Sequence, residues 1–395
     1  MRTNILACLT FLLGMISVGG IAYYMLALVA VRRLQRQNRL CAFFQVDHPP
    51  LTLLKPLCGI DPELKRNLET FFLQDYPSFE VLFAVKNESD PAVALVHELA
   101  KRHPKVPCSL IVVGESLFPN AKVFSLEQMA SIAKYDILVV TDSDVSVTDK
   151  YLTAIAGHFE SKEVGLVTNL YRGIGGRDFW SKLEALGMST EFMGGVVTAN
   201  FLEGMKFSLG PSMAISRECL KAIGGFESLS DYLADDFVLG EKTIAAGYKV
   251  ILSTHAVEHH AYSTGFRDSF KHRLRWNRSS RFSRPAGYVG QGFTYGLPLA
   301  ILLCLVAQTG WSIFLLACSG LVRGWLAYAL GRQLLADLAV LPRLWMIPLQ
   351  DCISFAAWIG GFLGKEVVWR NIRYQIVAGG RFVRMAHTNS KTTKE

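Results

Sequence analysis

The stretch that decides the fold is Ile137-Leu138-Val139-Val140-Thr141-Asp142-Ser143-Asp144. Its first five residues are typical of a fully buried strand. Two carboxylates separated by one residue follow that strand directly, and such a pair can bind a hard divalent cation, which prefers oxygen ligands and neutralises a diphosphate. The alternative is an ordinary turn after a strand. The position after the fourth predicted strand favours a functional pair.

The surrounding pattern indicates an α/β domain with a largely parallel sheet, because short apolar runs alternate with helical patterns. The expected strands are 51–57, 80–85, 109–113, 137–141 and 164–168, and the expected helices are 62–73, 91–102, 123–133 and 150–159. Sheets of this kind bind ligands at the carboxyl ends of their strands. The polar residues directly after the strands are therefore the candidate site.

Composition argues against a disordered chain and a purely soluble enzyme. The chain has 395 residues, of which 51% are hydrophobic, and a formal net charge of +8. A net positive charge suits an anionic membrane surface or a phosphate-bearing ligand. The eight cysteines form no Cys-x-x-Cys pair, so we expect reduced thiols without a zinc site or a disulfide framework.

Membrane segments are expected at both ends of the chain. Residues 4–31 are apolar, long enough to cross a bilayer, and are followed by the basic cluster Arg32, Arg33, Arg36 and Arg39. This order predicts a retained anchor with the following segment in the cytoplasm. Apolar character returns over 293–330 and 344–363, which predicts two or three further spans, and the basic residues after 363 favour an even number.

Further candidate residues follow other predicted strands or start helices. Asp90 could accept hydrogen bonds from a ribose or a base, or cap the helix that begins near Pro91. Lys122 is either a point charge beside a diphosphate or a surface lysine. Asp235 and Asp236 lie in an apolar stretch, where burial would raise a carboxyl pKa as a general base requires. The alternative interpretation is that both acids stand in the first turn of a helix, where the helix dipole stabilises negative charge.

The segment 270–278 combines basic and aromatic residues just before the returning apolar run. One interpretation is an amphipathic helix at the membrane interface. The other is a segment whose Arg275 and Trp276 reach the active site, and the two interpretations are compatible. His255, His259 and His260 cluster without a matching ligand pair, so no metal site is expected there. The glycines at 173–176 match neither a P-loop nor a dinucleotide fingerprint.

Taken in order, these motifs resemble the family 2-type membrane glycosyltransferases. The closer resemblance is to the ceramide glucosyltransferase family and its bacterial relatives that glycosylate hopanoid lipids, and it covers roughly residues 50–295. The motifs that carry it are 55–59 (Lys-Pro-Leu-Cys-Gly), 74–77 (Gln-Asp-Tyr-Pro), Asp90, 142–144 (Asp-Ser-Asp), 233–236 (Leu-Ala-Asp-Asp), and His272 with Arg275 and Trp276.

The resemblance implies a fold and a set of residue roles. The fold is a GT-A-type, Rossmann-like nucleotide-sugar domain carrying N-terminal and C-terminal transmembrane helices. Asp142 and Asp144 would form the Asp-x-Asp element, with Asp144 as the main ligand of Mn²⁺ or Mg²⁺, and Asp236 would be the catalytic base. The remaining substrate-binding residues would be Asp90, Lys122, Asp235, His272, Arg275 and Trp276. His272 departs from the family's Gln or Arg, which fits the hopanoid branch at least as well as the ceramide branch.

The implied function is inverting transfer of glucose or N-acetylglucosamine from a UDP-sugar to the hydroxyl of a membrane lipid, ceramide or a hopanoid. Its partners would be the donor, the lipid and the bilayer, without nucleic acid. The expected organisation is an anchor (1–39), a cytoplasmic catalytic domain (40–260), an interface segment (261–290), transmembrane helices (291–365) and a basic tail (366–395). A bacterial inner membrane is favoured over the Golgi. The alternatives are a processive polysaccharide synthase and a transporter or scaffold without enzymatic activity.

Overall fold

An eight-stranded sheet forms the centre of the computed structural model, which describes residues 2–41, 48–369 and 372–385. The strand order is β3-β2-β1-β4-β7-β6-β8-β5. The strands are β1 Leu51–Pro56, β2 Phe79–Val85, β3 Cys108–Val112, β4 Ile137–Thr141, β5 Val145–Ser146, β6 Val164–Gly175, β7 Ser212–Ser216 and β8 Lys249–Ala261. The expected α/β class is confirmed. The sheet is mixed, because β7 runs antiparallel to both β4 and β6.

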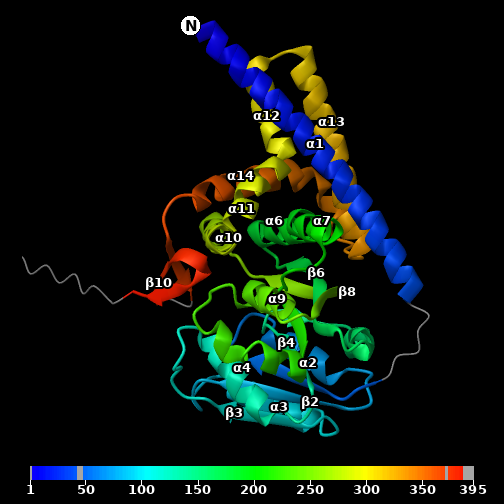
Figure 1. Ribbon diagram of the computed structural model, residues 1–395, viewed down its shortest axis with the longest axis vertical. Coiled ribbons are helices and arrows are strands. Elements are labelled where there is room, and N and C mark those ends of the chain that lie inside the picture. The colour runs from blue at the N-terminus through cyan, green and yellow to red at the C-terminus, as the bar shows by residue number, and fades with distance from the viewer. Residues whose placement is uncertain (1, 42–47, 370–371, 386–395) are drawn as a thin grey trace, which may run out of the picture.

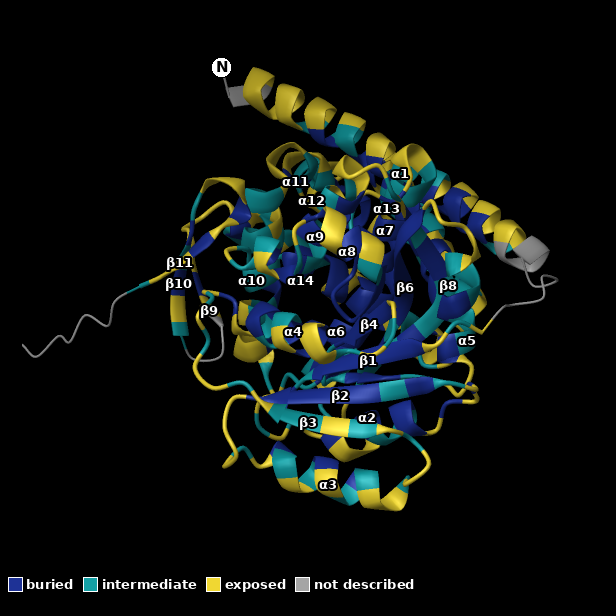
Figure 2. Ribbon diagram, turned by 60° about the horizontal axis from the view of Figure 1, so that its bottom comes forward, coloured by how far each residue is buried: buried dark blue, intermediate teal, exposed yellow. Residues whose placement is uncertain are grey.

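The expected helices of the first half of the domain are confirmed as α2 Leu64–Phe72, α3 Ala92–Arg102, α4 Ala121–Ile132 and α5 Tyr151–Ala156. Asn120 shows why α4 begins where it does, since its side-chain oxygen accepts the N–H groups of Lys122 and Val123. Figure 2 shows the central strands β1, β4 and β6 as buried. Their apolar runs form the main core of the domain.

A second layer of helices covers β6 on the side facing the apolar part of the chain (Figure 1). It contains α6 Phe179–Gly187, a π-helical turn Met188–Phe192 and α7 Met193–Glu203. The glycines of 173–176 allow this packing, since a Cβ at Gly173 would lie 2.4 Å from the carbonyl oxygen of Ala185. The remaining helices of the domain are α8 Arg217–Ala222 and α9 Asp235–Ala245.

The apolar ends of the chain pack together above this layer. The long helix α1 Arg2–Cys41 contacts α12 Gly296–Ala307 and α13 Gly310–Ala327, and Figure 1 shows α12, α13 and the N-terminal half of α1 at the end of the molecule away from the sheet. Between them and the sheet lie α10 Phe266–Ser283, α11 Pro285–Gln291 and α14 Ile347–Gly361. The N-terminal helix and the apolar segment that returns after the sheet domain thus pack into one apolar body.

Among the residues that the structure describes, two helices are long and apolar enough to cross a membrane, Asn4–Gln37 and Gly310–Leu334. A third candidate span arises if the helical segments Pro285–Thr294 and Gly296–Ala307 are taken together as one span with a bend of 56° between them. The described C-terminal part therefore offers one or two candidate spans by length and composition, where the sequence predicts two or three. The apolar run 344–363 forms α14, whose 15 residues extend only about 22 Å. This helix buries Gln350, Asp351 and Ser354 against its neighbours.

The segment expected to be a basic tail is folded where the structure describes it. The strands β9 Glu366–Trp369, β10 Ile372–Ile376 and β11 Phe382–Arg384 form an antiparallel sheet. Its buried residues pack against Phe282 of α10 and Leu233. The alternation of Ile372, Tyr374 and Ile376 on one face explains the sheet. Residues 386–395 of the expected tail lie outside the described residues.

Candidate active site

The carboxyl end of β4 places Asp142 and Asp144 at the edge of the sheet, as the sequence predicts. Lys55, at the end of the neighbouring strand β1, donates to the hydroxyl of Thr141 at 2.9 Å and to the carbonyl oxygen of Asp142 at 2.8 Å. Burial lowers the pKa of the Lys55 amine to about 7, although the charge of Asp142 opposes this shift. Lys55 therefore fixes the backbone that carries the two acids.

Lys122 joins the two pairs of acids that the sequence singled out. From the first turn of α4 its amine lies 2.7 Å from Asp142 Oδ1 and 3.6 Å from Asp235 Oδ2. Burial alone would lower the pKa of Lys122, but these carboxylates outweigh it and raise the pKa above its ordinary value. The alternative of an exposed surface lysine does not hold, since its side chain is only 15% exposed.

Asp144 faces His259, which comes from β8. The imidazole Nε2 lies 3.3 Å from Asp144 Oδ2, and the second oxygen, Oδ1, is buried without a hydrogen-bond partner among the described residues. Burial would raise the pKa of Asp144, but the charge and hydrogen bond of His259 outweigh it and hold the pKa at about 2. Asp144 therefore presents a charged, unpartnered oxygen inside the site.

These residues fit a divalent cation that is held partly by the substrate. Within the part of the chain that the structure describes, no group of three or more His, Cys, Asp or Glu is placed to hold a metal ion. Mg²⁺ is nevertheless usually bound by one or two carboxylates, several waters and substrate phosphates. The unpartnered Asp144 Oδ1 supplies such a carboxylate, and His259 is a nitrogen donor beside it.

Asp235 and Asp236 begin helix α9. Asp236 Oδ2 accepts the N–H of Gly210 at 2.8 Å, and Oδ1 accepts the N–H of Phe237 at 2.8 Å. Burial, followed by the nearby charge of Asp235, raises the pKa of Asp236 to about 6. Burial also raises the pKa of Asp235, against the lowering effect of Lys122. The acids therefore occupy the first turn of a helix, as one interpretation expects, and burial raises their pKa, as the other requires.

The basic-aromatic segment forms the helix α10, which contacts α6 and α14. Burial lowers the pKa of Arg275, and the negative charges of Asp142 and Asp144 oppose this shift. His272 lies 4.6 Å from Trp276, measured between ring centroids. The imidazole Nδ1 of His272 lies 2.6 Å from Oε1 of Glu184, a residue that is 2% exposed. Glu184, from α6, is a site residue that sequence reasoning missed.

Asp90 lies on the loop after β2 and performs the capping role. Its carboxylate accepts the N–H of Ala92 at 2.9 Å and that of Gly59 at 3.0 Å. It thereby connects its own loop to the 55–59 motif, where Gly59 has a φ of +72° that favours glycine. The described contacts do not connect Asp90 to the other acids.

The fold of the body matches that of a solved glycosyltransferase. The chain is similar to the mannosyltransferase PcManGT from Pyrobaculum calidifontis, solved in complex with GDP-Man and Mn²⁺, with a TM-score of 0.50 and 20% identity over 89% of this chain and 99% of that one. At this identity the likeness shows the fold alone. The body of the chain has the GT-A glycosyltransferase fold.

The sequence comparisons give the family. The model of glycosyl transferase family 21 matches residues 12–382, so the chain belongs to this family. It is 29% identical over 229 residues to ceramide glucosyltransferase 1 of Caenorhabditis elegans, covering 58% of this chain and 49% of that protein. It is 39% identical over 102 residues to the ceramide glucosyltransferase of Komagataella phaffii, covering 25% and 20%. The chain thus spans about half of the first relative's length.

Proposed function

We propose that the protein is a membrane-bound inverting glycosyltransferase that moves a hexose from a UDP-sugar to the hydroxyl of a membrane lipid. The observation that carries this proposal is the closeness of Asp236 to the Asp142–Asp144 pair: a Cβ at Gly210 would lie 3.1 Å from Asp236 Oδ2 and 3.7 Å from Asp142 Oδ2. Family membership supports it, because the relatives named above are ceramide glucosyltransferases. The donor sugar is glucose or N-acetylglucosamine, and the acceptor is ceramide or a hopanoid.

In the proposed reaction Asp236 is the general base. Its carboxylate accepts the proton of the lipid hydroxyl as that oxygen forms a bond to C1 of the sugar. The bond from C1 to the diphosphate oxygen breaks on the opposite face, and UDP leaves with its electron pair. A pKa near 6 suits this role, because the group is ionised at neutral pH and still basic enough to hold a proton. The N–H groups of Gly210 and Phe237 orient it.

The leaving diphosphate would be stabilised by cations of this chain. Asp142 and Asp144 oppose the lowering of the Arg275 pKa, and this guanidinium would neutralise charge that develops as UDP departs. Bound Mn²⁺ or Mg²⁺ would supply Lewis-acid stabilisation of the diphosphate oxygens. Asp144 would hold it, with Asp142 and His259 beside it. Asp90, Lys122 and Asp235 would shape the rest of the donor site.

The arrangement of layers suits a lipid acceptor. Helix α10 carries Arg275 and Trp276 and lies between the sheet and the helices that could cross a bilayer. A lipid could thus present its hydroxyl to Asp236 while its chains stay in the membrane. We place the catalytic body in the cytoplasm, because the basic cluster at residues 32–39 follows the first apolar helix. A bacterial inner membrane is favoured over the Golgi.

The test is release of UDP by the detergent-solubilised full chain with Mn²⁺. UDP-glucose and UDP-N-acetylglucosamine are each offered with ceramide or with a polyhydroxylated hopanoid. We expect release that depends on one acceptor and falls at least 1000-fold in Asp236→Asn. The matched control is Asp231→Asn, an exposed acid on the loop before α9, which should keep wild-type activity. Acceptor-dependent release that survives in Asp236→Asn would contradict the assignment of the base.

A further inference from the structure

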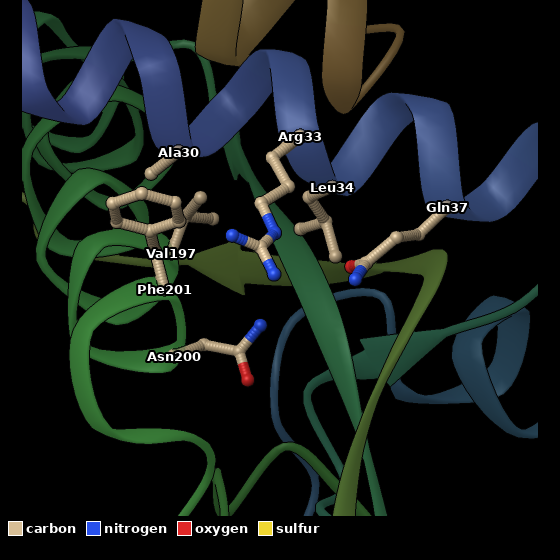
Figure 3. Close-up of a pocket in the computed structure, with 7 residues that line it drawn as sticks. All are labelled: Ala30, Arg33, Leu34, Gln37, Val197, Asn200 and Phe201. Atoms are coloured by element: carbon tan, nitrogen blue, oxygen red, sulfur yellow. The ribbon is translucent and has the colours of Figure 1, made fainter.

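A cavity of about 140 Å³ lies between α1 and α7, lined by residues that the active site does not use. Figure 3 shows the guanidinium of Arg33 and the side-chain amides of Gln37 and Asn200 directed into the same space. Leu34, Val197 and Phe201 form the apolar part of the lining. The cavity therefore combines hydrogen-bond donors with an apolar wall.

The polar groups of this cavity are available to a ligand. Within the described residues, Arg33 has no carboxylate within 4.0 Å, and its guanidinium lies 5.4 Å from the centre of the Phe201 ring. Glu203, at the end of α7, is already paired with Lys206 at 3.1 Å and with Arg284 at 2.5 Å. No hydrogen bond to a described residue engages the side chains of Gln37 or Asn200. A guanidinium and two amides thus face a space without a counter-charge.

The surface of α1 changes in character beside the cavity. On the same helix turn, the guanidinium of Arg32 lies 5.2 Å from the ring centre of Trp325 on α13, and Trp325 is 44% exposed. Tryptophan is enriched where membrane meets water. The preceding turns of α1 expose apolar side chains, with Met25 45% and Val29 49% exposed. The cavity therefore lies where an apolar helix surface gives way to a basic one.

We propose that this cavity binds the phosphate of a membrane phospholipid. The guanidinium fork of Arg33 matches two phosphate oxygens, and the amides of Gln37 and Asn200 can donate to the others. The volume suits a phosphate headgroup and not a whole lipid, so the acyl chains would follow the exposed surface of α1. A lipid is the expected source because that apolar surface adjoins the cavity. Such a lipid would brace α1 against α7.

The test is binding of dioctanoyl phosphatidylglycerol to the purified full chain in neutral detergent, followed by native mass spectrometry. We expect Arg33→Gln to weaken binding at least tenfold. The matched control is Arg36→Gln, which removes an exposed charge from the same basic cluster but does not line the cavity, and it should stay within twofold of wild type. Asn200→Asp should also weaken binding at least tenfold, because it places a negative charge beside the phosphate.

Three further results decide the proposal. Equal losses in Arg33→Gln and Arg36→Gln would show a diffuse surface-charge effect and overturn it. Displacement of the lipid by millimolar inorganic phosphate would assign the cavity to a soluble anion and overturn the lipid source. If Arg33→Gln does not fold, Arg33→Lys replaces it, because lysine keeps the positive charge but lacks the two-pronged guanidinium. Lipid binding within twofold of wild type in both Arg33→Lys and Asn200→Asp would reject the site.

Discussion

At the scale of single residues, Asp236 predicts a pH dependence that can be told apart from acid unfolding. A general base must be ionised, so kcat/KM should fall about tenfold per pH unit below pH 6 and stay level above it. A carboxyl whose pKa is raised on folding binds protons more tightly in the folded state, so protonation of Asp236 near pH 6 stabilises the fold. The loss of activity should therefore precede any loss of stability.

The measurement is kcat/KM from pH 5 to 8 alongside the melting temperature at each pH. Asp231→Asn serves as the control and should reproduce the wild-type profile. A profile that is flat across this range, or one that falls only together with the melting temperature, would refute the assignment of Asp236.

Gly210 tests how closely the base is positioned. A Cβ at this residue would lie 3.1 Å from Asp236 Oδ2, the oxygen that accepts the Gly210 N–H. Gly210→Ala should push the carboxylate by a few tenths of an ångström and lower kcat about tenfold or more, because misplaced reacting groups lose rate steeply. The melting temperature should change little. Gly195→Ala is the matched control, since a Cβ at Gly195 would meet no described atom within 4 Å, and equal kcat losses in both variants would contradict the role of Gly210.

The residues of the site differ in how far sequence alone could find them. Asp142, Asp144, Asp235 and Asp236 stand in short local motifs, so their pattern predicts them. The contacts of Asp144 with His259 and of His272 with Glu184 join residues 115 and 88 positions apart. Only the order of strands in the sheet and the packing of α6 on β6 bring such partners together. Spacing along the chain carries no signal of that kind.

At the scale of elements, α13 and α14 are joined by a buried ion pair. Arg323 Nε and Nη2 each lie 2.8 Å from an oxygen of Asp351, and both residues are almost fully buried. Asp351→Asn should destabilise the protein by about 3–5 kcal/mol, because it leaves a buried guanidinium without its counter-charge. The double variant Arg323→Met with Asp351→Leu should recover most of this loss, since it removes both charges.

Thermal melting of the detergent-solubilised variants measures the loss of stability and its recovery in the double variant. The control is Arg332→Gln, an exposed arginine on the same stretch of helix, which should melt like wild type. If Asp351→Asn melts within a degree of wild type, or if the double variant is less stable than Asp351→Asn, the pair does not join the two helices as proposed.

The elements also show where sequence patterns fail. The sequence predicts the starts of β1 to β4 to within one residue, because each is a short buried run between turn signals. The start of β6 at Val164 is predicted as well, whereas β5, β7 and β8 are not among the expected strands. β7 is short, and β8 places polar residues such as His255, Glu258 and His259 within the sheet, so its apolar pattern is interrupted. The small C-terminal sheet was missed because its basic charge obscured a weak alternation.

At the scale of the whole molecule, apolar side chains are exposed on α1, α12 and α13, far from the polar body. Phe11 is 71%, Phe314 55% and Leu321 75% exposed, and a soluble protein rarely exposes a continuous patch of this kind. Figure 2 shows the N-terminal half of α1 mostly exposed. If a bilayer covers this surface, Phe314→Asp should raise the free energy of insertion, by up to the roughly 2.5–3.5 kcal/mol that Asp costs at a helix centre, because Phe314 lies within the candidate span.

The fraction of protein retained in membranes after carbonate extraction measures this cost, and it should fall clearly in Phe314→Asp. Val112→Asp is the control, since Val112 is 47% exposed on β3, at the opposite end of the molecule, and should leave retention unchanged. Equal retention of wild type and Phe314→Asp would mean that something other than lipid covers the helices. It would also remove the physical basis for an acceptor that reaches Asp236 from the membrane.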